Sequence, residues 1–333
     1  MEGLTELTPF LTFFVGVALL FDFLNGFHDS ANTVATMISS RAMAPRSALA
    51  LNAAANFTGP FLFGVAVATT IGHEVVAEEA VTLSTVLAAL VGAIVWNVLT
   101  WLLGIPSSSS HALVGGLIGS AAVRSGFEAI LLPGLTKIVL TLFISPIVGL
   151  LSGYLLLKIT LFLARGASPR INVFFKRAQM VTATALALSH GTNDAQKTMG
   201  IITMGLLAKG ALPTFHVPMW VIAVCAGAMA LGTALGGWRI IHTLGGKFYK
   251  IRPIHSFTSQ IASAGVILGA ALIGGPVSTT HVVSTTILGA GSAERLSKVR
   301  WGLVGQIVMA WLLTIPASGL LAVVSYLAIE RIL

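Results

Sequence analysis

The sequence has little charge and almost no cysteine. Only 9% of its 333 residues are charged, whereas 56% are hydrophobic and the mean hydropathy is +0.93. A soluble domain is roughly one-quarter charged, so the composition excludes a soluble fold. The single cysteine, Cys225, excludes an intramolecular disulfide and a cysteine-based metal site. Because the apolar runs are as long as helices, the chain is predicted to be an all-α polytopic membrane protein and not an outer-membrane barrel.

Ten apolar runs, separated by proline, glycine or charged residues, are candidates for bilayer crossings. The runs 10–40 and 178–208 are too long for one simple span, and each has a polar, glycine-containing interruption near its middle. These two runs are predicted to form broken or strongly tilted helices. The runs 107–123 and 278–292 are short and follow a proline, which predicts re-entrant helical hairpins. About ten to twelve transmembrane segments are expected, and the other runs lie near 47–70, 82–104, 131–164, 216–237, 255–274 and 302–328.

The basic residues fall mainly on one side of the predicted membrane. If both termini face outward, thirteen basic residues lie in inner loops and four lie outside or at the outer edge. This bias favours that orientation and explains the net charge of +8 without nucleic acid. The outer residues are Arg124, Lys137, Lys209 and Arg331. The inner residues are Arg41, Arg46, Arg165, Arg170, Lys176, Arg177, Arg239, Lys247, Lys250, Arg252, Arg295, Lys298 and Arg300.

The two polar interruptions indicate an internal duplication. NGFHDSAN at 25–32 aligns with SHGTNDAQK at 189–197, so that Asp29 matches Asp194 and His28 matches Asn193. The runs PSSSSH and PVSTTH begin 77 and 82 residues after those aspartates. We therefore expect a first repeat at 1–165, a short basic cytoplasmic linker at 166–177 and a second repeat at 178–333. Five crossings in each half invert the second repeat, an arrangement typical of secondary transporters with a midplane site, although a channel could share it.

All three aspartates, Asp22, Asp29 and Asp194, lie inside apolar segments. An ionisable residue at membrane depth is costly, so it is by default a functional candidate. The alternative is a structural carboxylate that caps a broken helix, and for Asp22 both interpretations stay open. The carboxylates can bind a hard cation such as Na⁺ or take a proton. Carbonyl groups freed by the breaks would add oxygens, as would the side chains of Asn32, Asn193 and Gln196.

Two hydroxyl tracts begin the short apolar runs. A helix N-terminus presents unpaired N–H groups and a partial positive charge, and hydroxyls add donors, so the paired tracts predict a cradle for a small oxyanion. Either tract alone also fits an ordinary N-cap. His111 and His281, which end the tracts, are expected to steady them by hydrogen bonds. The tracts are Ser107, Ser108, Ser109 and Ser110 in the first half and Ser278, Thr279 and Thr280 in the second.

A carboxylate beside such a cradle restricts the anion. An ionised aspartate repels an anion unless a cation intervenes or the anion has a proton to donate. Phosphate keeps at least one O–H at neutral pH and sulfate has none, so the pairing favours phosphate, or its analogue arsenate, over sulfate. Lys197 can neutralise the anion or pair with Asp194, three residues before it.

These motifs resemble a known family. GFHDSAN at 26–32 and GTNDAQK at 191–197 resemble the paired signatures of the inorganic phosphate transporter (PiT) family, and the resemblance covers essentially the whole chain. It implies a secondary transporter with inverted repeats that carries phosphate with Na⁺ or H⁺, or as a neutral metal–phosphate complex. His28 replaces the usual asparagine, and Lys197 stands where the first copy has Asn32. Both departures bear on the identity of the coupling cation, because a histidine can titrate near neutral pH.

Site residues follow from the motifs and the resemblance together. The expected coupling-cation residues are Asp29, Asn32, Asp194, Asn193 and His28, with Asp29 and Asp194 as Na⁺ ligands. The expected phosphate-binding residues are Ser107, Ser108, Ser109, Ser110, Ser278, Thr279, Thr280, Gln196 and Lys197.

The sequence as a whole predicts a phosphate importer of the inner or plasma membrane that works by alternating access. No enzymatic activity and no resident cofactor are expected. The expected partners are inorganic phosphate, the coupling cation and the lipid bilayer; a homodimer is left open. The alternatives are a sulfate or other oxyanion permease, a carrier of metal–phosphate, and a channel. An intramembrane hydrolase is disfavoured because no GxSxG context is present.

Overall fold

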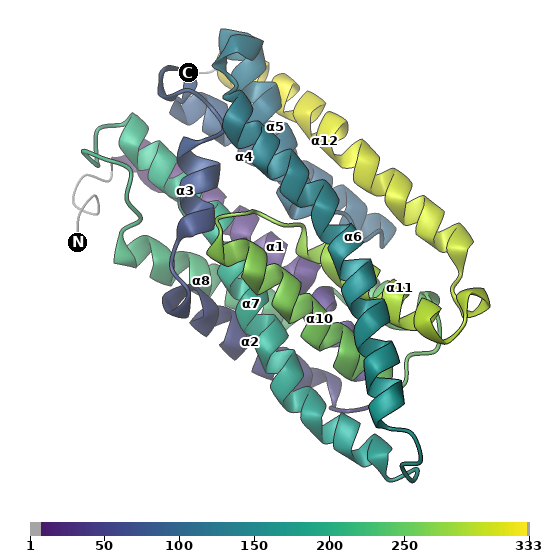
Figure 1. The fold of residues 1–333 in the computed structure, drawn as a ribbon. Coiled ribbons are helices and arrows are strands. Elements are labelled where there is room, and N and C mark those ends of the chain that lie inside the picture. The colour runs from purple at the N-terminus through teal and green to yellow at the C-terminus, as the bar shows by residue number, and fades with distance from the viewer. Residues whose placement is uncertain (1–7, 332–333) are drawn as a thin grey trace.

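The computed structural model describes residues 8–331, and within that range the chain is helical apart from turns, loops and one isolated β-bridge between Val76 and Ile130. The long helices lie side by side in an elongated bundle (Figure 1). The α-helices are α1 (Pro9–Ser39), α2 (Pro45–Leu62), α3 (Ala66–His73), α4 (Leu83–Leu103), α5 (Ser109–Ser125), α6 (Leu132–Leu163), α7 (Ile171–Ala208), α8 (Met219–Leu235), α9 (Trp238–His242), α10 (Pro253–Leu272), α11 (Thr279–Glu294) and α12 (Trp301–Ile329). The shorter helical turns are η1 (Glu78–Ala80), η2 (Phe127–Ala129), the π-helical η3 (Thr243–Lys247) and η4 (Leu296–Lys298).

The order of elements in the first half of the chain recurs in the second. Each half begins with a long helix, α1 or α7, followed by a bent helix pair and a helix of 21 or 20 residues. A short helix of 17 or 16 residues, α5 or α11, then precedes the final long helix, α6 or α12. In Figure 1, α6 ends at the loop to α7 at the lower right, whereas α12 ends at the upper left. These two corresponding helices therefore run in opposite directions.

The two long helices α1 and α7 are continuous through the polar motifs, so the prediction of a break there is wrong. The motif glycines serve close packing instead. A Cβ on Gly26 would lie 2.2 Å from the carbonyl oxygen of Met229 in α8. A Cβ on Gly191 would lie 2.3 Å from the carbonyl oxygen of Asn56 in α2. The glycines thus let a neighbouring helix approach, and they do not free backbone carbonyls for a ligand.

The sharp bends lie in the helix pairs that follow. The axis turns by 77° between α2 and α3 and by 59° between α8 and the α9–η3 segment. Within residues 8–331, four helices are long and apolar enough to cross a membrane, and the bent pairs raise the number to six. This is fewer than the ten to twelve segments predicted. Charged residues interrupt the apolar sequence of α7, and α5 and α11 are shorter than the roughly 20 residues of a full crossing.

The last helix of each half packs on the other half. α6 covers α10 and α11, whereas α12 covers α4 and α5. Glycine allows the approach here too, since a Cβ on Gly153 of α6 would lie 2.3 Å from the carbonyl oxygen of Thr286 in α11. A Cβ on Gly115 of α5 would lie 2.4 Å from the carbonyl oxygen of Ile315 in α12. The halves therefore interlock, and each short helix is held by elements of both.

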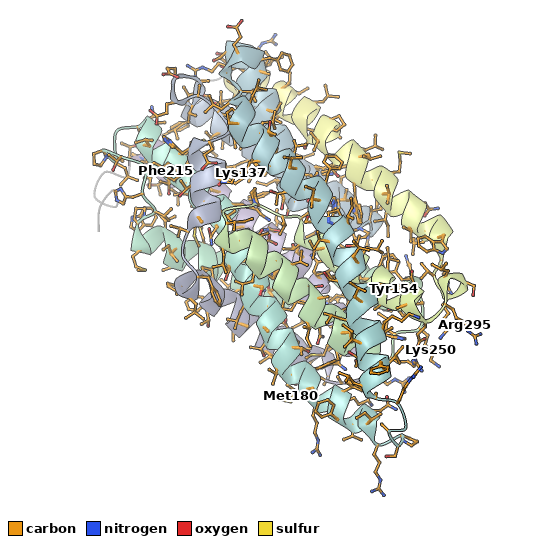
Figure 2. The ribbon with its side chains drawn as sticks, in the orientation of Figure 1. Lys137, Tyr154, Met180, Phe215, Lys250 and Arg295 are labelled. Carbon is orange, nitrogen blue, oxygen red and sulfur yellow. The ribbon has the colours of Figure 1, made fainter. Side chains whose placement is uncertain are left out.

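Basic side chains gather at one end of the bundle. Figure 2 shows Lys250 and Arg295 at the lower right, the end that also carries the loop between α6 and α7, and Lys137 towards the opposite end. That loop runs from the end of α6 at Leu163 to the start of α7 at Ile171. Helix α7 therefore already includes the second half of the segment 166–177 that the sequence predicts as a linker.

Candidate functional site

The polar motifs place a buried face of α1 against α7. Asp22, Asn25, Asp29 and Asn32 recur at helical intervals of three or four residues, so they share one side of α1, and all four are buried. The helices α1 and α7 contact each other, and ligand atoms of Asp29, His190 and Asp194 lie within 4.8 Å of one another. Two aspartates that are 165 residues apart in the sequence thus form one buried acidic centre.

The short helices α5 and α11 begin beside this centre. Ser108 and Ser278 are their N-caps, and the two hydroxyls accept the backbone N–H groups of His111 at 3.1 Å and His281 at 3.2 Å. The capping role that each tract could have had in isolation therefore falls to one residue in each. The remaining hydroxyls of the two tracts contact other groups.

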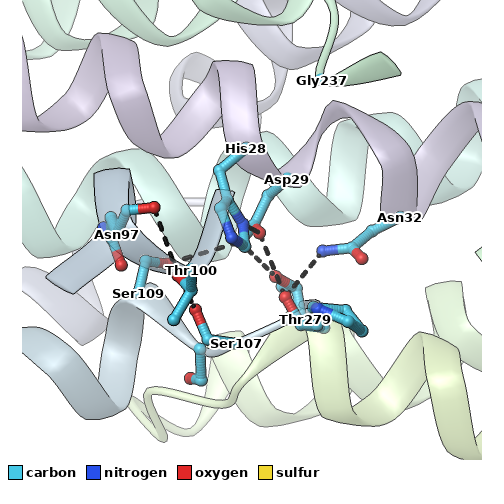
Figure 3. Close-up of polar contacts among 12 residues, drawn as sticks. His28, Asp29, Asn32, Asn97, Thr100, Ser107, Ser109, Gly237 and Thr279 are labelled. Carbon is cyan, nitrogen blue, oxygen red and sulfur yellow. Dashed lines mark hydrogen bonds and ion pairs between the residues drawn. The ribbon is translucent and has the colours of Figure 1, made fainter. Parts of the chain in front are cut away.

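Three of these hydroxyls contact the aspartates, and Figure 3 shows Ser109 and Thr279 near Asp29. Ser109 Oγ donates to Asp29 at 3.3 Å, and Thr280 Oγ1 donates to Asp29 at 3.1 Å. Thr279 Oγ1 lies between the two carboxylates, 2.8 Å from Asp194 Oδ2 and 3.5 Å from Asp29 Oδ2. A hydroxyl has one proton, so Thr279 can donate to only one carboxylate at a time. The centre is therefore rich in oxygen lone pairs, the ligands that hard cations prefer.

The two tracts also contact each other. Ser110 Oγ donates to the carbonyl oxygen of Val277 at 3.0 Å, and the rings of His111 and His281 lie 4.5 Å apart between centroids. His111 Nδ1 lies 2.7 Å from Ser108 Oγ, the hydrogen bond that the sequence predicts. The N-termini of α5 and α11, with their partial positive charges, therefore converge at one place beside the aspartates.

Lys197 is buried and pairs with Asp194. Its ammonium group also donates to Ser110 Oγ at 2.5 Å and to the carbonyl oxygen of Val277 at 3.1 Å. These contacts use all three of its N–H donors. Of the two roles that the sequence leaves open, the structure shows the ion pair, and the same ammonium group touches the hydroxyl tract of α5. The centre therefore holds two carboxyl groups and one ammonium group.

The other three residues expected to bind the cation, His28, Asn32 and Asn193, lie at the edge of the centre. His28 Nδ1 lies 2.7 Å from the adjoining carboxylate of Asp29. Asn32 Nδ2 donates to Thr280 Oγ1 at 3.0 Å, and Asn193 Nδ2 donates to a backbone carbonyl at 3.3 Å. The side-chain oxygens of both asparagines have no hydrogen-bond partner among residues 8–331. Both amide oxygens are therefore available to a ligand.

Ser107 and Gln196 make contacts away from the acidic centre. Ser107 Oγ lies 2.7 Å from Thr100 Oγ1 on the preceding helix. Gln196 Nε2 donates to the carbonyl oxygen of Gly64 at 2.7 Å, and its Oε1 accepts the N–H of Val67 at 2.8 Å. Gln196 thus holds the bend between α2 and α3, and its amide is engaged there instead of facing the hydroxyl tracts.

Two site-related residues were not among those predicted. His190 Nε2 lies 3.0 Å from Asp194 Oδ2, so His190 joins the two aspartates in one group of potential ligands. Its position one helical turn before Asp194 is the sequence signal that could have identified it as a site residue. Ser30 accepts the N–H of Gly237 at 2.7 Å and so steadies the second bend as Gln196 steadies the first. No sequence signal marks Ser30, because the second motif has alanine at the corresponding position.

Comparison with known proteins bears on this site. The family model described as the phosphate transporter family matches residues 25–322. The chain belongs to this family. Probable low-affinity inorganic phosphate transporters of Rhizobium meliloti (strain 1021) and Bacillus subtilis (strain 168) are each 44% identical to it. The alignments cover 97% of this chain and 98% of the Rhizobium protein, and 95% of this chain and 96% of the Bacillus protein.

A solved structure described as the sodium-dependent phosphate transporter has the same fold as this member of the phosphate transporter family. The TM-score is 0.89 at 24% sequence identity, and the match covers 98% of this chain and all of that chain. Membership of the phosphate transporter family makes the chain a multi-pass membrane transporter and not an enzyme. The alternative of an intramembrane hydrolase is therefore wrong.

Proposed function

We propose that this chain imports inorganic phosphate by symport with a cation, through alternating access at the site where α1, α7 and the starts of α5 and α11 meet. The observation that carries the proposal is the convergence of Asp29, Asp194 and both hydroxyl tracts in one buried centre. Helix N-termini and hydroxyls suit a small oxyanion, and the paired carboxylates suit a cation.

The charge of the centre explains why the two ligands travel together. The centre holds two carboxyl groups and the one ammonium group of Lys197, and phosphate adds at least one negative charge. A buried excess of negative charge is costly, so phosphate enters with one or more compensating cations. The cation in turn is held most firmly when phosphate supplies further oxygens. Electrostatics therefore supports symport.

The same centre supports phosphate over sulfate. An anion held by the tracts lies beside the carboxyl groups of Asp29 and Asp194, and an anion without a proton can only repel a carboxylate. Phosphate can donate its O–H to that oxygen. Accordingly, we assign phosphate binding to Ser109, Ser110, Thr279, Thr280 and Lys197. Ser107, Ser108 and Ser278 hold the tracts in place. Cation binding is assigned to Asp29 and Asp194, together with Asn32, Asn193 and His28. Gln196 belongs to the bend and not to this set.

The membrane orientation that supports import has the basic end of the bundle in the cytoplasm. Lys250 and Arg295 share that end with the α6–α7 loop, and the positive-inside bias then places both termini outside. The terminal residues themselves, 1–7 and 332–333, lie outside the described range. The opposite directions of α6 and α12 support two inverted repeats, with α5 and α11 as re-entrant hairpins from opposite faces.

The group Asp29, His190 and Asp194 supports a second candidate, in which a divalent metal enters as a metal–phosphate complex. Two carboxylates and one imidazole within 4.8 Å form a donor set for a divalent ion. In this case uptake requires added divalent metal and stops with a chelator, whereas symport with Na⁺ or H⁺ continues.

Uptake of labelled phosphate into proteoliposomes tests the function. We expect an inward Na⁺ or proton gradient to stimulate uptake, and we expect excess sulfate not to compete. Asp29→Asn and Asp194→Asn should each lower uptake at least about tenfold, the loss expected when a charged hydrogen-bonding group is removed from a buried site. Glu128→Gln, at an exposed carboxylate of η2, serves as the matched control. If uptake responds neither to the Na⁺ or proton gradient nor to divalent metal, the symport proposal is wrong. If either aspartate variant takes up phosphate at a near-normal rate, that aspartate is not part of the site.

A further inference from the structure

Asp22 is a buried carboxyl that the proposed site does not use. It lies on α1 seven residues before Asp29, about 10 Å away along the helix axis. Its exposed fraction is 0%, and neither carboxylate oxygen has a hydrogen-bond partner among residues 8–331. The surrounding stretch of α1 belongs to the larger hydrophobic cluster, which includes Ala18, Phe21 and Cys225.

Polar groups of two neighbouring helices lie near this carboxyl. On α7 they include Thr198, Asp194 and Lys197, and on α8 they include the thiol of Cys225. The hydroxyl of Thr198 is also without a partner of ordinary hydrogen-bond geometry within the described range. Helix α4, which packs against α1 as well, has no charged residue or histidine. Lys197 is no free counter-ion, because its three donors are already taken by Asp194, Ser110 and Val277.

For an ionised carboxylate in such a place, the hydroxyl of Thr198 is a single nearby donor, and the nearby ammonium of Lys197 is already shared. Removal of a carboxylate from water costs several kcal/mol when nothing compensates it, so the neutral acid is the stable form in this conformation. A metal ion is a poor alternative, because hard cations take about six oxygen ligands. The hydroxyl of Thr198 lies near this carboxyl, and the nearby carboxylate of Asp194 already pairs with Lys197. The group of potential metal ligands in the described part of the chain is the separate one at Asp29, His190 and Asp194.

We propose that Asp22 is a proton-binding site that moves one proton with each phosphate, separate from the cation site at Asp29 and Asp194. The inference rests on the proposed phosphate transport and adds a second coupled ion to it. In the conformation described here, where Asp22 is fully buried, the carboxyl carries its proton. When the cytoplasmic side opens, water solvates the carboxylate and the proton leaves for that water. When the outer side opens, the carboxylate takes a proton from the outer solution.

Asp22→Asn tests this role because the amide has the shape of the neutral acid and cannot release a proton. A carrier locked in the protonated form still exchanges labelled phosphate across the membrane when phosphate is present on both sides. It cannot complete the return step without substrate. We therefore expect exchange near the wild-type rate, loss of accumulation driven by an inward proton gradient, and loss of phosphate-dependent proton entry reported by a pH dye inside the vesicles. Asp22→Glu should retain both activities.

Thr203→Val is the matched control. Like Asp22, Thr203 has a buried polar side chain without a hydrogen-bond partner among residues 8–331, but it lies on α7. This variant should keep proton-driven accumulation. Accumulation by Asp22→Asn at the wild-type level would overturn the proposal. The proposal would also be overturned if Asp22→Asn lost both exchange and accumulation and Asp22→Glu were equally inactive, because Asp22 would then have a structural role. Net phosphate accumulation by the wild type without any proton entry would overturn the proton site alone. A wild type that neither accumulates nor exchanges phosphate would overturn the proposed function itself.

Discussion

Lys197 and Asp194 form a charged pair with no access to water. Burial of two charges costs free energy that their attraction offsets only when the remaining donors are also satisfied. Lys197 meets this condition, because Ser110 and Val277 accept its other two N–H groups. The pair is therefore tolerable while it is intact, and loss of either partner leaves an isolated buried charge.

Lys197→Met keeps most of the side-chain volume and removes the positive charge. We expect a loss of about 3–5 kcal/mol of stability, because Asp194 is left buried without its counter-ion. The double variant Lys197→Met/Asp194→Asn should recover much of this loss without recovering transport. Thermal unfolding of the purified proteins in detergent, with phosphate uptake in parallel, measures both effects. If the double variant is no more stable than the single one, the ion pair is not the source of the loss.

At the scale of the helices, Gly26 sets the distance between α1 and α8. Gly26→Ala puts a Cβ 2.2 Å from the carbonyl oxygen of Met229, a backbone atom that can move only with its helix. We expect a destabilisation of about 1–3 kcal/mol, the usual cost of overpacking, and a larger fractional loss of uptake because α1 also carries Asp29. Thermal unfolding and uptake assays measure these changes.

Gly16→Ala is the control for this substitution. Gly16 lies on the same helix, and nothing lies within 4 Å of a Cβ placed there. Alanine also favours the helix over glycine, so this variant should be as stable as the wild type or slightly more stable. An equal loss in both variants would mean that α1 tolerates no added methyl group anywhere, and the close approach to α8 would then not be the cause.

The glycines also show what the sequence could and could not predict. The match between Asp29 and Asp194 is visible in the aligned motifs, so their common site follows from the repeat alone. A glycine inside a polar motif, however, fits a helix break and a close helix contact equally well. Only the position of Met229, which lies about 200 residues away in the sequence, decides between them. The role of Gln196 is hidden for the same reason, since its partners Gly64 and Val67 belong to a bend that no local motif marks.

The interlocked packing of the whole molecule makes the two halves dependent on each other. Each short helix is covered by the final helix of the opposite half, α5 by α12 and α11 by α6. An inverted arrangement lets equivalent elements do this from opposite membrane faces. Under the proposed alternating access, elements of both halves would therefore move together when one face opens.

Equivalent residues on the turns after α5 and α11 test this arrangement directly. Glu128 in η2 and Ser297 in η4 occupy matching positions in the two halves, and both are exposed. The native Cys225 is fully buried, so the wild type gives little background with a membrane-impermeant maleimide. In intact cells we expect Glu128→Cys to react and Ser297→Cys to react only after permeabilisation, because η4 lies next to Arg295 at the basic end. Retained phosphate uptake shows that each variant is folded, and reaction of both cysteines from the same side would contradict inverted repeats, since matching turns of parallel repeats share a face.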